Sequence, residues 1–169
     1  MFSKGDLIVH QRYGAGTVIG IRKMERKGEE RRYFCIEMVS DGGTLMIPEK
    51  RLEAADMRPA LHDMKLIKEV LLKTPEELDD EHRPRQTAIE KKLDSREPRQ
   101  IVQALRDLCW RQQTGKLTTT DTRLKRKAIT ALLDELVLNP AYTLINAREK
   151  LDTLIERAMA HHQGLAETS

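Results

Sequence analysis

The chain has 169 residues, of which 34% are charged and 39% hydrophobic, with 30 Lys and Arg against 27 Asp and Glu. This length allows one ordinary domain or two small ones, and no window approaches the roughly 18 apolar residues of a membrane span. The N-terminus lacks a signal-peptide pattern, and the two cysteines, Cys35 and Cys109, have neither CxxC nor disulfide-framework spacing. These features indicate a cytoplasmic protein with reduced thiols.

The first fifty residues carry the signals of short β-strands. Stretches rich in β-branched residues alternate with turns that contain glycine or charged residues, at 6–10, 16–24, 31–39 and 44–48. A spacing of about ten to twelve residues is typical of an antiparallel meander. Four to five strands of this length usually curl into a small barrel.

After Pro59 the hydrophobic period changes from two to 3.6, which predicts helices. Pro98 and Gly115 mark the start and stop of one helix, and Thr119 or Thr120 is the expected N-cap of the next, which ends before Pro140. The other expected helices are one with a stripe of Leu61, Met64, Ile67, Leu71 and Leu72, one over 85–95, and one over 143–162.

The predicted fold class is therefore α+β with two domains. A small antiparallel β-barrel is expected over 1–57, and an all-α domain of about five helices over 58–162. The segment 74–84 is expected to be an acidic loop or a short helical turn, and its carboxylate-rich part, 75–81, a solvated linker. Residues 163–169 are expected to form a disordered tail.

Several stretches resemble the CarD/CdnL family of bacterial RNA polymerase-binding transcription regulators. They are "FSKGDLIVHQRYGAGTVIGI", "YFCIEM", "LMIPEKRL", "ALRDL", "GKLTTTD" and "ALLDELVL". The similarity runs from Phe2 to about Leu138. Its N-terminal part is shared with the polymerase-interacting domain of transcription–repair coupling factor, but the chain has no P-loop or helicase motif, which favours CarD/CdnL.

The resemblance implies a Tudor-like (SH3-like) domain that binds the β subunit of RNA polymerase. It also implies a helical domain that contacts promoter DNA at the upstream edge of the bubble and stabilises the open complex. The implied polymerase contacts are Met24, Leu45, Met46, Ile47 and Pro48. Some members have arginine at the positions of Met24 and Met46, so the contact here would be more apolar. Met46 is either an exposed docking group on a strand edge or a core residue.

A basic block lies between residues 83 and 127. It holds 13 Lys and Arg and 5 Asp and Glu, an excess of 13 − 5 = 8 positive charges. Such an excess favours a polyanionic partner, because cations that neutralise phosphates release counterions. The alternative is a solvated helical surface.

Trp110 lies within this block and is the single tryptophan of the chain. On a helix over 98–113, Cys109 falls on the apolar stripe with Leu105 and Leu108, whereas Trp110 falls on the polar side with Arg106 and Asp107. An exposed indole suits a wedge at a DNA fork, and the alternative is packing under a neighbouring helix. The family places its wedge directly after "RDL", which is Cys109 here. The predicted DNA-binding residues are Trp110, Arg106, Arg111, Lys116, Arg123, Lys125, Arg126 and Lys127.

No catalytic, metal-binding or cofactor motif is visible, since HExxH, GxxxxGK[ST], GxGxxG and GxSxG are all missing. We therefore expect a monomeric, non-enzymatic transcription factor without a cofactor that bridges polymerase and promoter DNA. The alternative is a protein–protein adaptor that binds RNA polymerase or another large machine without contacting DNA.

Overall fold

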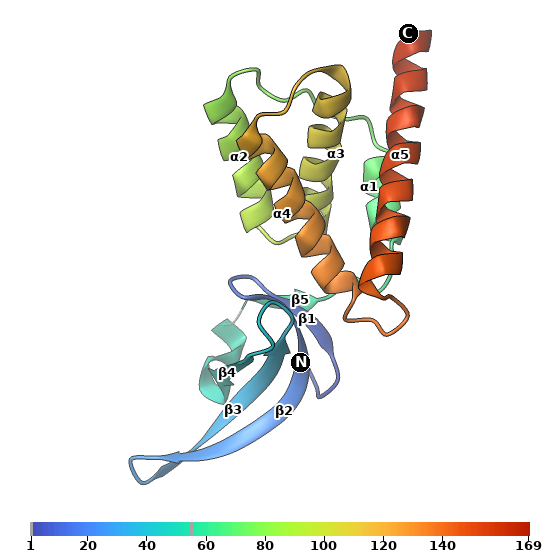
Figure 1. The fold of residues 1–169 in the computed structure, drawn as a ribbon. Coiled ribbons are helices and arrows are strands. Elements are labelled where there is room, and N and C mark those ends of the chain that lie inside the picture. Colours follow the sequence, from blue (N-terminus) through green and yellow to red (C-terminus); the bar gives the residue numbers. More distant parts are fainter. Residues whose placement is uncertain (1, 55) are drawn as a thin grey trace.

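A computed structural model describes residues 2–54 and 56–169. The chain forms a β-sheet domain followed by a helical bundle, and the C-terminus lies at the end of the bundle farthest from the sheet (Figure 1). This arrangement confirms the predicted α+β fold class.

The sheet has five antiparallel strands in the order β4-β3-β2-β1-β5. β2 and β3 form a long hairpin whose turn, Lys27-Gly28, has positive φ at both residues (54° and 77°), as a two-residue hairpin requires. β5 extends the sheet to Pro59, slightly beyond the boundary expected at 57. The elements are β1 (Leu7–His10), β2 (Gly14–Arg26), β3 (Glu29–Met38), β4 (Thr44–Pro48), the 3-10 helix η1 (Glu49–Ala54) and β5 (Met57–Pro59).

The sheet curls around a core of its own. Buried side chains from β1 to β4 meet on one face, and Met57 of β5 packs against them. Among the described residues β4 and β5 do not pair, so the hydrogen-bonded ladder stays open between them. The buried members are Ile8, Val18, Phe34, Ile36, Met38 and Ile47.

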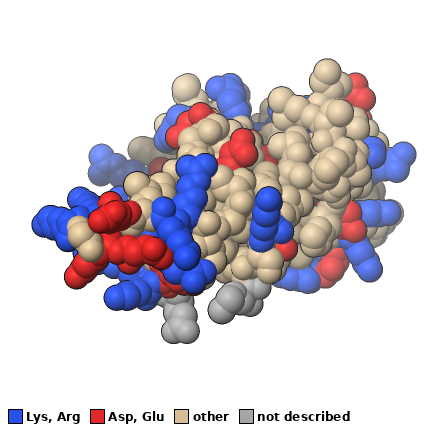
Figure 2. Space-filling view, turned by 90° about the horizontal axis from the view of Figure 1, so that it is seen from below, with Lys and Arg blue, Asp and Glu red and all other residues tan. Residues whose placement is uncertain are grey.

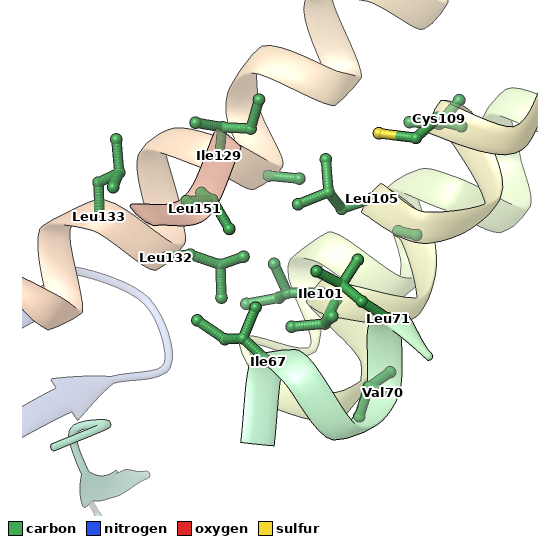
Figure 3. Close-up of a cluster of buried hydrophobic side chains, with 14 of the residues drawn as sticks. Ile67, Val70, Leu71, Ile101, Leu105, Cys109, Ile129, Leu132, Leu133 and Leu151 are labelled. Atoms are coloured by element: carbon green, nitrogen blue, oxygen red, sulfur yellow. The ribbon is translucent and has the colours of Figure 1, made fainter. Parts of the chain in front are cut away.

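The helical domain packs around α3. Every residue of its predicted apolar stripe is buried, and the side chains of α1, α4 and α5 meet this stripe in one cluster (Figure 3). α5 continues as a helix to Thr168, so the disordered tail expected over 163–169 is not observed. The helices are α1 (Lys65–Leu71), α2 (His82–Asp94), α3 (Pro98–Thr114), α4 (Thr119–Leu136) and α5 (Leu144–Thr168).

Two kinds of contact hold the domains together. Val9, Ala15 and Ala60 form a small apolar cluster on the far side of β1, against which Leu138 of the helical domain packs. Beside it, Arg58 of β5 forms a bidentate ion pair with the buried Glu135 of α4, at 2.7 and 2.9 Å. Nothing in the sequence indicated how the two domains are oriented.

Candidate functional site

The predicted polymerase-binding strand β4 lies at one edge of the sheet. Leu45 and Ile47 point to the core, where Ile47 is buried and Leu45 packs against the cluster. Met46 lies on the opposite face, half-buried and outside that core cluster. Met46 is therefore neither a fully exposed docking group nor a core residue. Its side chain is partly accessible and faces away from the core.

Met24 and Met46 belong to the same face of the sheet. The register pairs Met24 with Arg31, Cys35 with Met46, and Tyr33 with Pro48. Because alternate residues of a strand share a face, these pairs all lie opposite the core. Met24 is 49% exposed on the β2–β3 hairpin. Seen from the sheet end, charged side chains of both signs gather around this hairpin, at the left of Figure 2.

Trp110 is half-buried in the last turns of α3. Its ring meets the ring of His162 from α5 edge-on, with 6.2 Å between centroids, and it packs against the helical core. The sequence left open whether the indole is exposed or packs under a neighbouring helix. In the structure, part of the indole packs against α5 and part remains accessible. The accessible part lines a depression of about 360 Å³ together with Glu76, Glu77 and Asp80.

The predicted placement of Arg106 is wrong. Arg106 is only 4% exposed; its Nε donates to Asp107 at 2.8 Å and its Nη1 to the carbonyl of Val70 at 3.5 Å. Burial raises the pKa of Asp107, against the opposing effect of Arg106. The reason is tertiary: α1 and the segment after it cover this side of α3, and the amide of Glu76 donates to Asp107 at 3.0 Å. Arg106 therefore contacts protein groups and not solvent.

Cys109 lies in the core, as the helical-face argument predicted. It is 3% exposed, and burial raises the pKa of its thiol to about 11. The residue that directly follows "RDL" is thus inaccessible, and the next residue, Trp110, is the accessible one.

The remaining predicted cations do not form one patch. Arg111 and Lys116 line a depression with Arg83 at the end of the bundle, where Arg111 also contacts Asp80 at 3.4 Å. Lys125 donates to Gln112 at 2.7 Å beside Cys109. Arg123, Arg126 and Lys127 line a groove between the helical domain and the sheet.

The start of α4 is capped by the protein itself. Thr118, one residue before the expected N-cap, accepts from the amide of Asp121, whose carboxylate accepts from the amide of Thr118. Asp121 is fully buried and pairs with buried Arg85 at 2.9 Å. Burial alone would raise the pKa of Asp121, but hydrogen bonds from Arg85, Thr118 and Gln86 outweigh it and lower the pKa to about 2. A phosphate bound at these amides would compete with this cap.

Three arginines at the domain boundary were not among the residues predicted from the sequence. Arg12 follows β1, Arg58 lies in β5, and Arg96 lies between α2 and α3, and all three line the groove that contains Arg126. The sequence predicts a turn between the stretches 6–10 and 16–24, but nothing in it indicates that this turn faces α4.

The described residues hold no group of three or more His, Cys, Asp or Glu side chains placed to bind a metal ion. Among the helices in the described part of the chain, none combines the length and apolarity needed to cross a membrane.

Two family models match this chain. Residues 2–61 match the CarD-like/TRCF RID domain, and residues 66–152, more than half of the chain, match the CarD C-terminal domain. YdeB of Bacillus subtilis (strain 168), named as a candidate transcription factor, is 36% identical over 59 residues, which are 35% of this chain and 39% of YdeB. The match therefore spans about two-fifths of that relative's length.

Proposed function

This chain belongs to the CarD family of transcription factors, and we propose that it binds the β subunit of RNA polymerase through β4 and stabilises the promoter open complex through its helical domain. The observation that carries the proposal is the separation of two accessible apolar groups. Met46 lies on the outer face of an edge strand, and Trp110 lies near the end of α3 that points away from the sheet (Figure 1).

The edge strand suits a protein partner. A strand that pairs on one side only can accept a further strand, and a half-buried methionine adapts to the surface it meets. Tyr33 and Pro48, paired across the same face, extend the apolar surface beside Met46. The partner would thus be bound by backbone hydrogen bonds and by apolar contact.

Trp110 suits a DNA fork. An indole that projects from a helix end can stack on an unpaired base or enter a base step, and at a fork much of the unstacking cost has already been met. Anchoring to polymerase would raise the effective concentration of this contact, so it can be weak and still act. A factor that binds the melted promoter better than the closed one shifts the equilibrium by its differential affinity.

The second candidate, an adaptor without DNA contact, is favoured by one observation. Carboxylates of Glu76, Glu77 and Asp80 line the depression at Trp110, which holds one cation, Arg111. They would repel phosphates and attract a cationic side chain of a protein partner. The two candidates share the anchor and differ in what Trp110 meets.

The anchor is tested by the variant Met46→Glu in co-purification with polymerase. A carboxylate in an apolar contact must be desolvated, so we expect at least about tenfold weaker retention of the β subunit. The matched control is Ile145→Glu, which places the same charge on an apolar side chain that is 74% exposed on α5. Both variants should unfold at the temperature of the unmodified chain. Undiminished retention by Met46→Glu would move the anchor elsewhere.

A further inference from the structure

A groove of about 720 Å³ lies between the two domains. One wall is the β1–β2 turn with Arg12 and Tyr13, and the other is the face of α4 that carries Arg123, Arg126 and Lys127. Arg58 and Arg96 lie at the junction of these walls. The groove is thus built by both domains and exists because their orientation is fixed.

Cations outnumber anions in the groove. Six Lys and Arg side chains line it against three Asp and Glu. Glu135 is already bound by Arg58, and Asp94 lies 3.6 Å from Lys127. Burial raises the pKa of the third carboxyl, Asp134, and the nearby Arg96 opposes this effect. With three carboxylates against six cations, the groove keeps an excess of positive charge.

Three of the cations have no carboxylate within 4.0 Å among the residues that the structure describes: Arg12, Arg96 and Arg126. Arg12 lies 5.5 Å above the ring of Tyr13, which is itself at the rim. Cations that outnumber their counter-charges repel one another, and an anionic ligand would relieve this repulsion.

Arg96 is held in place by a specific local structure. Its φ is +54°, a conformation that costs a non-glycine residue free energy. Its carbonyl accepts from Arg58 Nε at 2.9 Å, and its Nη2 donates to the carbonyl of Arg12 at 3.3 Å. A Cβ at Gly14 would lie 2.9 Å from Arg96 Nη1, so glycine makes room for this guanidinium. The arginines are thus positioned by the fold and not merely exposed.

We propose that this interdomain groove binds the phosphodiester backbone of a nucleic-acid strand. This inference rests on the proposed function. It extends the DNA-contacting surface of the protein from the helical domain to the sheet domain. Arg123 and Lys127 are four residues apart, about 6 Å along the helix axis, and Arg96 and Arg12 line the same groove. A single phosphate cannot contact all four cations. A strand offers one phosphate for each ~3.4 Å of duplex axis and can contact them in succession.

The charge test uses the full chain and a forked DNA duplex, with affinity measured against salt concentration. The variant Arg12→Gln with Arg126→Gln removes one cation from each wall. We expect at least about tenfold weaker binding at low salt and a salt slope smaller by about two, one for each phosphate that is no longer neutralised. The control is Arg148→Gln with Arg157→Gln, two exposed arginines on α5 outside the groove. Equal affinity and slope in the two double variants would overturn the proposal.

The contact is mapped in the complete polymerase–promoter complex by Tyr13→p-benzoylphenylalanine, a photocrosslinking substitution. Crosslinks to DNA are expected from position 13, and not from the same substitution at Ile145. Crosslinks from position 13 to polymerase alone would overturn the proposal. A second pair of results would also overturn the proposal. Inorganic pyrophosphate would stabilise the free chain only when Arg12 and Arg126 are present, while substitution of these two residues would leave the salt slope of DNA binding unchanged.

Measuring the lifetime of the open complex distinguishes a failure of the groove proposal from a failure of the proposed function. If the unmodified chain lengthens it and the groove variant does so equally, the groove proposal is wrong and the proposed function stands. If the unmodified chain has no effect on the lifetime, the proposed function is wrong and the groove proposal falls with it.

Discussion

Asp121 and Arg85 form a buried ion pair inside the basic block. Their side chains are 0% and 2% exposed, and the guanidinium of Arg85 also donates to the carbonyls of Asp79 and Asp80, both at 2.9 Å. One arginine thus joins α2, the acidic segment and the start of α4. A charge so engaged stabilises the fold and is not available to a ligand.

We expect Asp121→Asn to lower the free energy of unfolding by about 3–5 kcal/mol, because it leaves Arg85 buried without its counter-charge. The pH dependence gives a second readout. Since the pKa of Asp121 is about 2 in the folded state and lies below its ordinary value of 3.8, its stabilisation is present above pH ~4 and is lost as pH falls towards 2.

Urea unfolding between pH 2 and pH 7 measures both effects. The control is Asp152→Asn, which breaks the exposed pair with Arg148 and should cost well under about 1 kcal/mol. If Asp121→Asn lowered the free energy of unfolding by a similarly small amount, and left its decrease between pH 4 and pH 2 unchanged, the buried pair would not stabilise the fold.

At the level of elements, the β1–β2–β3 meander depends on Gly16. A Cβ there would lie 2.6 Å from Ile36 Cγ2 and 2.7 Å from the carbonyl oxygen of Glu37. The second atom belongs to the backbone of the neighbouring strand, so the strands would have to separate. Ile36 belongs to the core of the sheet, and the sheet carries the proposed anchor.

We expect Gly16→Ala to destabilise the protein by about 1–3 kcal/mol through overpacking. The same substitution at Gly164 is the control: a Cβ there meets nothing within 4 Å, and alanine favours the helix by up to about 1 kcal/mol. Thermal unfolding measures the two changes. Shifts of the same sign and size would contradict the packing argument.

Local periodicity predicted the elements well. Strands β1 to β4, the five helices and the burial of Cys109 with Leu105 and Leu108 follow from patterns within single segments, whereas the short strand β5 was not among the predicted stretches. The burial of Arg106 could not be predicted, because it depends on α1 and the following segment crossing a side of α3 that has a polar sequence pattern. A helical wheel describes one helix, and it cannot show what covers each face.

At the scale of the whole molecule, local sequence patterns also could not show which cations of the basic block, 83–127, lie together. Its cations lie within one stretch of the sequence, yet the fold places some at the end of the bundle, some in the groove, Lys125 beside Cys109 and Arg106 in the interior. The groove also takes Arg12 and Arg58 from the sheet domain, far away in sequence. Which charges act together is decided by domain orientation, and that orientation depends on contacts such as Arg58 with Glu135.

We propose that the chain bridges polymerase and melted promoter DNA, with its anchor on the sheet and Trp110 at the far end of the bundle. This assigns the contact at the fork to Trp110 and only a packing role to Cys109, which is buried beside it. Substitutions at these adjacent positions should therefore differ in function although they lie on one helix.

The most direct test is the lifetime of the open complex with the unmodified chain, Trp110→Ala, Trp110→Phe and Cys109→Ala, each shown to be folded and bound to polymerase. We predict that Trp110→Ala shortens the lifetime towards that of polymerase alone, that Trp110→Phe retains part of the effect, and that Cys109→Ala retains nearly all of it. A full effect with Trp110→Ala would show that Trp110 does not make the contact at the fork.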